Sequence, residues 1–257
     1  MRVKDIIERI EKYCPPELAY GWDNSGLLLG CLESEAKKIA VTLDVVPDTA
    51  RQAIEWGADM IVAHHPLIFS PIKKITFNNP QGKILNELAC NKIAVYTAHT
   101  NLDTAKKGIN AYLAEIFNLS DIRIVDIHTN DLSSGLGRVG TLESDIQLRE
   151  FAQIVKERLK TPYVRVCGDL NKIVRSAAVL SGSCSEYVEK AADMGADVII
   201  TGDLKYHECL DFDALGICVI DAGHFPTECI CVDILKKMIG SDMEIKVLEQ
   251  SDIFKFV

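Results

Sequence analysis

Short apolar runs alternate with segments of helical periodicity along most of the chain. The first such pattern has an apolar run at 39–43, a polar turn, an amphipathic segment at 47–56 and a second apolar run at 60–63. Short apolar runs bounded by turn residues are typical of buried strands. Two strands joined by a helix through short connections are parallel, with a right-handed crossover. The pattern therefore predicts a β-α-β unit.

The same pattern occurs again later in the chain, at a constant offset and without a gap. Its parts are a strand at 177–180, a helix at 185–194 and a strand at 198–201, and Gly57-Ala58-Asp59 corresponds to Gly195-Ala196-Asp197. An internal repeat of this kind indicates two copies of one structural unit.

A second pair of segments extends the repeat. Apolar runs at 93–98 and 217–222 are each followed by a histidine, with one inserted glycine in the later copy, and helices are predicted at 104–117 and 227–239. The sequence therefore predicts an α/β protein made of two related three-layer α/β halves with mostly parallel sheets.

The boundary between the halves is predicted in the segment 126–140, which is rich in Gly, Ser and Asn. We expect a first half at 1–125 and a second half at 126–257, with the last helix and strands able to pack back on the first. Other predicted elements are an amphipathic helix at 1–12, a helix at 147–159 and a strand near 244–248.

Composition narrows the class of protein. Hydrophobic residues make up 48% of the chain and charged residues 25%, the usual balance for a globular protein with a buried core. No apolar run approaches the roughly 18 residues that span a bilayer, and the first twelve residues do not read as a signal peptide. We therefore expect a cytoplasmic protein that does not enter membranes.

Charge and cysteine content disfavour nucleic-acid binding and cysteine-based metal sites. The net charge of −9 disfavours a nucleic-acid partner, and the pairs Lys73-Lys74 and Lys106-Lys107 are interpreted as solvated surface lysines. The nine cysteines lack paired spacing and are expected to be reduced thiols. Cys229 and Cys231 would point in different directions on a helix, which disfavours joint metal ligation.

Histidines gather where predicted strands end. His64 and His65 follow the strand at 60–63, His99 follows the strand at 93–98, and His224 follows the strand at 217–222. Open α/β sheets bind ligands beyond the carboxyl ends of their strands. A single histidine at a strand end is most often a hydrogen-bonded structural residue, and His64-His65 before Pro66 also suits a turn. The convergence of three strand ends favours a metal site.

Carboxylates accompany two of these histidines. Asp103 follows His99 by four residues and Glu228 follows His224 by four, a spacing that brings side chains together on a helix. Imidazole and carboxylate without thiolate suit Zn, Fe, Mn or Ni and disfavour a closed structural zinc site. His128 lies in the predicted linker and is interpreted as structural, whereas His207 follows another strand end and is a candidate to line the cleft.

Five motifs occur in an order that resembles one known family, the NGG-interacting-factor-three-like proteins, often labelled GTP cyclohydrolase I type 2. The motifs are Gly21-Trp22-Asp23-Asn24-Ser25-Gly26-Leu27, His64-His65-Pro66, His99-Thr100-Asn101-Leu102-Asp103, Gly202-Asp203-Leu204-Lys205-Tyr206-His207 and Gly223-His224-Phe225-Pro226-Thr227-Glu228. The resemblance covers nearly the whole chain, in the short form without a large inserted domain. The segment 225–227, between His224 and Glu228, departs from the family pattern.

The resemblance implies a dinuclear site in the cleft between the halves and a toroidal homohexamer. It implies two divalent ions per chain, Glu228 as a bridging ligand, and His99 close to the ions without binding them. The metal ligands that it implies are His64, His65, Asp103, His224 and Glu228.

The function implied is metal-dependent hydrolysis of a nucleotide or related small molecule, with His99 or His207 transferring protons. The substrate rests on the family label, because the chain lacks a Gly-rich phosphate loop and an arginine cluster, and Lys205 and Arg138 are the only basic residues in the motifs. Two alternatives stay open at this point. A metal-handling or metal-delivery protein without turnover would use the same ligands, and a transcription-linked interaction protein would leave them unexplained.

Overall fold

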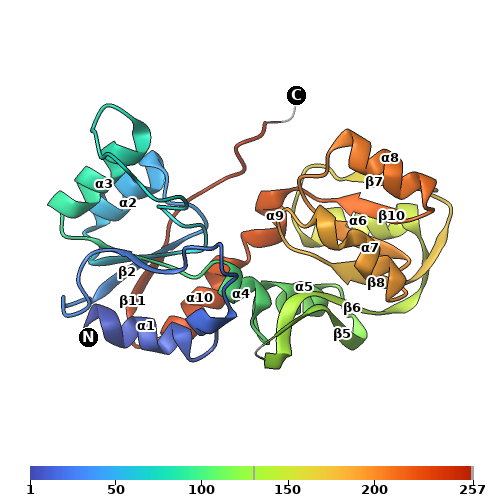
Figure 1. Cartoon of the computed structure of the whole chain (residues 1–257), viewed down its shortest axis with the longest axis horizontal. Helices are drawn as coiled ribbons and strands as arrows, with labels where there is room; N and C mark the ends of the chain where they lie inside the picture. The colour runs from blue at the N-terminus through green and yellow to red at the C-terminus, as the bar shows by residue number, and fades with distance from the viewer. Residues whose placement is uncertain (130, 256–257) are drawn as a thin grey trace. The chain divides into compact units, whose positions relative to one another are not determined.

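The computed structural model describes residues 1–129 and 131–255, and these form two compact units (Figure 1). The first unit comprises Met1–Leu102 and Cys231–Ser251; the second comprises Asp103–Ile230 and the described residues 252–255. This grouping differs from the predicted halves, because residues 103–125 belong to the second unit. Residues 231–251 return to the first unit, as the sequence analysis allowed.

A five-stranded sheet lies at the centre of the first unit. Its order is β1-β4-β3-β2-β11, with β1 antiparallel to β4 and the other neighbours parallel. The predicted β-α-β unit is confirmed here, since the helix α2 connects the parallel strands β2 and β3. The strands are β1 (Gly26–Leu29), β2 (Lys38–Thr42), β3 (Met60–Ala63), β4 (Ala94–Thr97) and β11 (Glu244–Val247).

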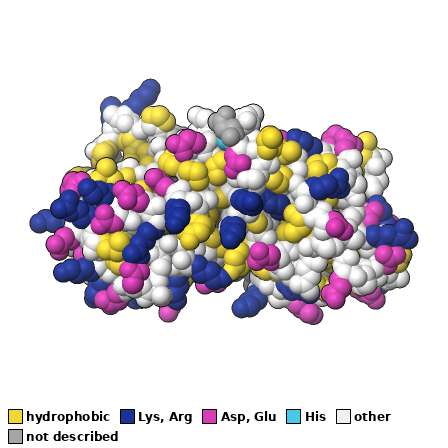
Figure 2. All heavy atoms as spheres, turned by 90° about the horizontal axis from the view of Figure 1, so that it is seen from below, with side chains coloured by type: hydrophobic (Ala, Val, Ile, Leu, Met, Phe, Trp, Pro, Cys, Tyr) yellow, Lys and Arg dark blue, Asp and Glu magenta, His cyan; other side chains and the backbone are white. Residues whose placement is uncertain are grey.

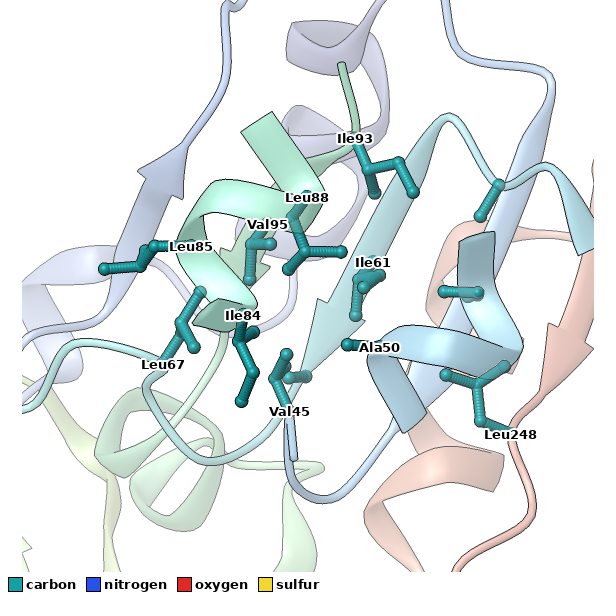
Figure 3. Packing of buried hydrophobic residues seen from close by; sticks show 14 residues of the cluster. Val45, Ala50, Ile61, Leu67, Ile84, Leu85, Leu88, Ile93, Val95 and Leu248 are labelled. Atoms are coloured by element: carbon teal, nitrogen blue, oxygen red, sulfur yellow. The ribbon is translucent and has the colours of Figure 1, made fainter. Parts of the chain in front are cut away.

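Helices cover both faces of this sheet, giving the three layers that the sequence predicts (Figure 1). The helices α2 and α3 pack on one face, where Ala50, Ile84 and Leu88 meet Ile61 and Val95 of the strands in a buried apolar cluster (Figure 3). The helices of the unit are α1 (Val3–Glu11), η1 (Pro16–Leu18), α2 (Pro47–Trp56), α3 (Pro80–Cys90) and α10 (Cys231–Ile239).

A six-stranded sheet of order β5-β6-β8-β9-β10-β7 lies at the centre of the second unit. Only its middle strands β8, β9 and β10 run parallel among the described strands. The prediction of mostly parallel sheets is therefore wrong for this unit, whose sheet is mixed. The strands are β5 (Ser120–His128), β6 (Asp131–Gln147), β7 (Arg165–Cys167), β8 (Ile173–Val179), β9 (Val198–Thr201) and β10 (Cys218–Asp221).

The second β-α-β repeat is also confirmed, as β8, the helical segment η2–α7 and β9. The repeated Gly-Ala-Asp has the same role in both units. Gly57 and Gly195 end their helices with positive φ, and the following aspartates, Asp59 and Asp197, each accept hydrogen bonds from backbone N–H groups at the neighbouring strand. The helices of the unit are α5 (Ile109–Ile116), α6 (Leu148–Arg158), η2 (Ser185–Tyr187), α7 (Val188–Asp193), α8 (Tyr206–Ala214) and α9 (His224–Glu228).

The segment 126–140 is not a linker. Its described residues other than Thr129, which lies in a turn, belong to the antiparallel strands β5 and β6. Its glycines serve close packing: a Cβ on Gly137 would lie 2.4 Å from Leu180 Cδ2, and one on Gly135 would lie 2.1 Å from the Asp126 carbonyl oxygen. A segment whose composition suggests flexibility is thus part of a sheet.

The helix predicted at 104–117 is the shorter α5, and a separate short helix, α4 (Thr100–Thr104), precedes it. The helix predicted at 227–239 is divided into the end of α9 and α10. The chain passes from one unit to the other at these places, within α4 and after α9. Within the described residues, no helix combines the length and apolar character needed to cross a membrane.

Surface charge is mixed on the face drawn in Figure 2, where lysines and arginines lie among aspartates and glutamates. The chain as a whole carries a net charge of −9.

Candidate metal centre

Three histidines meet at one edge of the first sheet. His64 and His65 directly follow β3, and His99 follows the adjacent parallel strand β4. The ring centroids are 5.0 Å apart for His64–His65, 5.2 Å for His64–His99 and 5.7 Å for His65–His99. One ring nitrogen of each lies within 4.8 Å of those of the others, close enough to share a metal ion. Two of the three strand ends that the sequence analysis places at one edge therefore meet here, whereas the third, the end of β10, belongs to the sheet of the second unit.

The two adjacent histidines are fixed through Nδ1. His64 Nδ1 lies 2.8 Å from the carbonyl oxygen of Ala98, and His65 Nδ1 lies 2.7 Å from Asp44 Oδ1. Asp44 is itself held by the side-chain amide of Gln250, which donates to Oδ2 at 2.7 Å. A carbonyl and an ionised carboxylate only accept hydrogen bonds, so Nδ1 carries the proton and Nε2 presents its lone pair. This is the usual arrangement of a metal-binding histidine and its supporting acceptor.

His99 is held in the same way by a buried carboxylate. Its Nδ1 lies 2.7 Å from Asp23 Oδ1, while Thr100 Oγ1 donates to Asp23 Oδ2 at 2.6 Å and Ser25 Oγ donates to it at 2.8 Å. Burial alone would raise the pKa of Asp23, but the hydrogen bonds from His99, Thr100 and Ser25 together hold that pKa well below its ordinary value. Asp23 is therefore an anion that fixes His99, which explains the motif in which it occurs.

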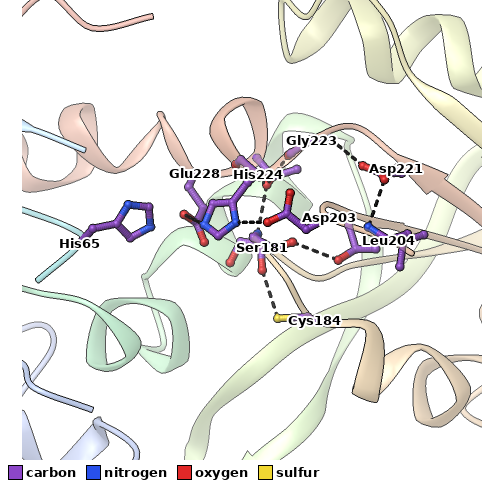
Figure 4. A network of polar contacts seen from close by, with 12 residues as sticks. His65, Ser181, Cys184, Asp203, Leu204, Asp221, Gly223, His224 and Glu228 are labelled. Atoms are coloured by element: carbon purple, nitrogen blue, oxygen red, sulfur yellow. Dashed lines mark hydrogen bonds and ion pairs between the residues drawn. The ribbon is translucent and has the colours of Figure 1, made fainter. Parts of the chain in front are cut away.

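The second unit brings a histidine and a glutamate together on α9. Gly223, with φ of 88°, turns the chain from β10 into this helix, which begins at His224. His224 Nε2 lies 2.9 Å from Glu228 Oε2, one helical turn later, and its Nδ1 lies 2.8 Å from Asp203 Oδ2 (Figure 4). Asp203 reaches the ring from a left-handed backbone conformation, φ 57°, that few side chains other than Asn and Asp adopt readily.

Carboxylates thus face both nitrogens of the His224 ring. A neutral imidazole carries one N–H and can donate to only one of them. The contact between Nε2 and the Glu228 carboxylate is therefore stabilised either by a second proton on the ring or by a cation held between these two groups. This donor set fits a divalent metal ion at Nε2 and Glu228, with Asp203 fixing the ring from behind.

A glycine makes room for the carboxylate of Glu228, a residue that is 4% exposed. A Cβ on Gly182 would lie 2.1 Å from Glu228 Oε1, and Gly182 has a positive φ of 63°. Its N–H donates to Thr227 Oγ1 at 3.0 Å, which fixes the loop against α9. Only a residue without a side chain lets this loop approach the carboxylate so closely.

Asp103 lies beside the same loop. The residue is 7% exposed, and Ser181 Oγ donates to its Oδ1 at 3.2 Å. Asn110 Nδ2 lies 3.1 Å from Ser181 Oγ and 3.2 Å from the Asp103 carbonyl oxygen, so it ties the loop to α4. Burial, followed by the charges of Asp103, Glu186 and Glu228, raises the pKa of the nearby Cys184 thiol well above its ordinary value. The negative charge gathered here favours a bound cation.

Asp221, at the end of β10, positions both partners of the His224–Asp203 pair. Its Oδ1 accepts from the N–H of Gly223 at 3.0 Å, and its Oδ2 accepts from the N–H of Leu204 at 3.1 Å (Figure 4). The guanidinium of Arg165 forms an ion pair with the same carboxylate. One buried carboxylate therefore holds the two loops that carry His224 and Asp203.

The remaining candidates have different surroundings. His207 is exposed on α8 with its ring 5.5 Å from that of Tyr206, and His128 lies on β5. All nine cysteines are free thiols, and within the described part of the chain none belongs to a group with metal-binding spacing. Sequence reasoning did not assign Asp23, Asp44 and Asp203, although Asp23 and Asp203 stand inside two of the motifs.

Comparison with known proteins places this chain in a family. The family model for Duf34/NIF3 (NGG1p interacting factor 3) matches residues 1–253. A protein of Clostridium acetobutylicum named GTP cyclohydrolase 1 type 2 homolog is 39% identical over 240 residues, covering 93% of this chain and 90% of that protein.

Solved structures have the same fold. A Bacillus cereus protein related to NIF3 superposes with a TM-score of 0.92 at 26% identity, covering 100% of this chain and 99% of that one. Reduced HcgD from Methanocaldococcus jannaschii superposes with a TM-score of 0.85 at 35% identity, covering 97% and 98%. The resemblance carried by the five motifs is confirmed over the whole fold, and the chain belongs to the Duf34/NIF3 family.

Proposed function

We propose that this protein is a dinuclear divalent-metal-dependent hydrolase that acts on a nucleotide or a related heterocyclic substrate. Its two ions would lie in the cleft that the family resemblance implies. The proposed ligands are His64, His65, Asp103, His224 and Glu228. The observation that carries the proposal is the shared anchoring of the histidines, each held at Nδ1 by an acceptor so that Nε2 is presented as a ligand.

The ligand types limit the choice of metal. Imidazole nitrogens and carboxylate oxygens without thiolate suit Zn, Fe, Mn or Ni. Two of the proposed ligands, Asp103 and Glu228, are buried carboxylates at one loop, and Glu228 can offer one oxygen to each of two ions. Five protein ligands would leave coordination positions open for substrate, as catalytic sites require.

When bound, the ions would activate water and polarise the group that the water attacks. His99 is the residue that we assign to proton transfer. Its Nδ1–H donates to the ionised Asp23, which fixes the ring and stabilises the charge that forms when Nε2 takes up a proton. His207, the other candidate, lacks a hydrogen-bonded carboxylate among the described contacts of its ring, and we place it second.

The substrate class comes from the relatives. Their name, GTP cyclohydrolase 1 type 2 homolog, suggests hydrolytic opening of a purine ring. We also propose that the chain assembles as a toroidal homohexamer, as the family resemblance implies, and that it acts in the cytoplasm. The molar mass in solution tests whether six chains assemble.

A hydrolase screen tests the proposal. Metal-stripped and metal-reloaded protein would be incubated with GTP, ATP and other nucleotides, and ring opening followed by the change in ultraviolet absorbance. We expect saturable turnover of at least one nucleotide after reloading and none after stripping. His99→Gln should lower turnover by about 100-fold or more, the usual contribution of a general base, whereas His207→Gln should change it far less.

Two results would contradict the proposal. Turnover that survives complete metal removal would exclude the proposed chemistry. Absence of turnover from fully loaded protein, together with transfer of its ions to an acceptor, would favour metal delivery instead.

A further inference from the structure

An exposed aromatic cluster in the first unit is not accounted for by the metal centre. The side chains of Trp22 and Phe69 are 62% and 52% exposed. Their ring centroids are 6.0 Å apart, and the ring of Tyr20 stacks on Trp22 at 5.7 Å with an interplanar angle of 9°. Aromatic rings expose much apolar area to water, so a cluster of them on the surface marks a binding site more often than isolated apolar residues do.

The cluster is continuous with the histidines of the candidate site. The Trp22 ring meets the His99 ring edge-on at 6.4 Å, and the Phe69 ring meets it at 6.3 Å with an interplanar angle of 83°. His99 in turn contacts the rings of His64 and His65. A ligand lying on Trp22 and Phe69 would therefore reach the residue that we assign to proton transfer.

Local hydrogen bonds hold the two aromatic residues in this place. Trp22 precedes Asp23, whose carboxylate is fixed by His99 and Thr100. The side-chain amide of the next residue, Asn24, donates to the backbone carbonyl of Ile68, which precedes Phe69. The loops that carry the two rings are thus tied to each other and to His99, so the aromatic surface is preorganised for a ligand.

We propose that Trp22 and Phe69 form the binding face for the planar heteroaromatic ring of the substrate. The ring would stack on these side chains, as nucleobases stack on aromatic residues elsewhere, with its edge toward His99. This inference rests on the proposed function for its substrate class. It adds the residues that recognise the ring, and it commits to a small planar heterocycle rather than to a protein partner.

The test is equilibrium binding to metal-loaded protein, which needs no turnover. Guanosine, GTP and ribose 5-phosphate would be titrated calorimetrically into wild type, Trp22→Ala, Phe69→Ala and Trp22→Phe. Loss of a stacking side chain should weaken guanosine and GTP binding by at least about tenfold. Trp22→Phe should retain most of the affinity, and ribose 5-phosphate should bind no differently to any of the variants.

Phe77→Ala is the matched control. Phe77 is a phenylalanine of similar exposure, 57%, in the same connection between β3 and α3. The Phe77→Ala variant should bind guanosine with wild-type affinity. Metal content and molar mass should be unchanged in all variants.

Unchanged guanosine affinity in Trp22→Ala and Phe69→Ala would overturn the inference, as would a wild type that binds none of the heteroaromatic probes. A changed molar mass with unchanged guanosine binding would assign the cluster to contacts between copies of the chain. Ring binding through Trp22 without any hydrolysis would support this inference while contradicting the proposed hydrolase.

Discussion

Replacement of Glu228 by glutamine is expected to lower the binding affinity for both metal ions together, in a protein that stays folded. The change keeps the size of the side chain and removes the charge that we propose both ions share. Loss of supporting groups around metal ligands typically costs about 10–100-fold in metal affinity, so loss of a ligand should cost at least that much. The Glu228 carboxylate is buried against Gly182 and contacts His224 Nε2, so solvent cannot readily replace its charge.

His99→Gln is the comparison for this variant. His99 is anchored like the proposed ligands, but the resemblance places it outside the direct coordination. We expect the His99→Gln variant to retain most of its metal and to lose turnover. Metal titration of both variants, with circular dichroism to verify folding, separates the two roles. Retention of both ions by Glu228→Gln, or complete loss by His99→Gln, would show that these assignments are reversed.

Gly182→Ala is expected to weaken metal binding without removing any proposed ligand. The added Cβ would lie 2.1 Å from Glu228 Oε1, so either the carboxylate or the loop must move. The left-handed backbone at this residue adds about 1 kcal/mol or more of strain for any residue with a side chain. Metal affinity should therefore fall together with the free energy of unfolding.

Gly195→Ala is the control that separates the effect of backbone strain from the effect of the close contact with Glu228. Gly195 also has a positive φ, 93°, but a Cβ there would meet no atom within 4 Å. This variant should lose a similar amount of stability, measured by urea unfolding of metal-free protein, and keep normal metal affinity. Equal metal affinity in the two variants would mean that the close approach of Gly182 does not matter for the site.

The parts of the fold that the sequence predicts best are the short buried strands. The bounds of β3 and β9 are as predicted, because an apolar run between a Gly-Ala-Asp turn and a polar strand end leaves little freedom. The histidine cluster was predictable for a related reason. The carboxyl ends of adjacent parallel strands meet, so residues that follow β3 and β4 must be neighbours.

The parts that were not predicted depend on contacts between distant residues. The glycines of 126–140 suggest a linker, and only the packing of Leu180 on Gly137 shows why they stand in a strand. The acceptors behind the histidines were missed because Asp44 and Asp203 each lie 21 residues from the ring that they hold. No local periodicity carries that information. The breaks after α4 and α9 were missed because they occur where the chain changes from one compact unit to the other.

We propose that one chain holds two divalent ions, and the metal content of reloaded protein measures this number. Protein stripped with a chelator would be reloaded separately with zinc, manganese, iron(II) or nickel, freed of excess metal, and measured by elemental analysis against its concentration. We expect the ratio to approach two ions per chain with at least one of these metals. A ratio that stops at one ion per chain with every metal, at saturating concentration, would contradict it.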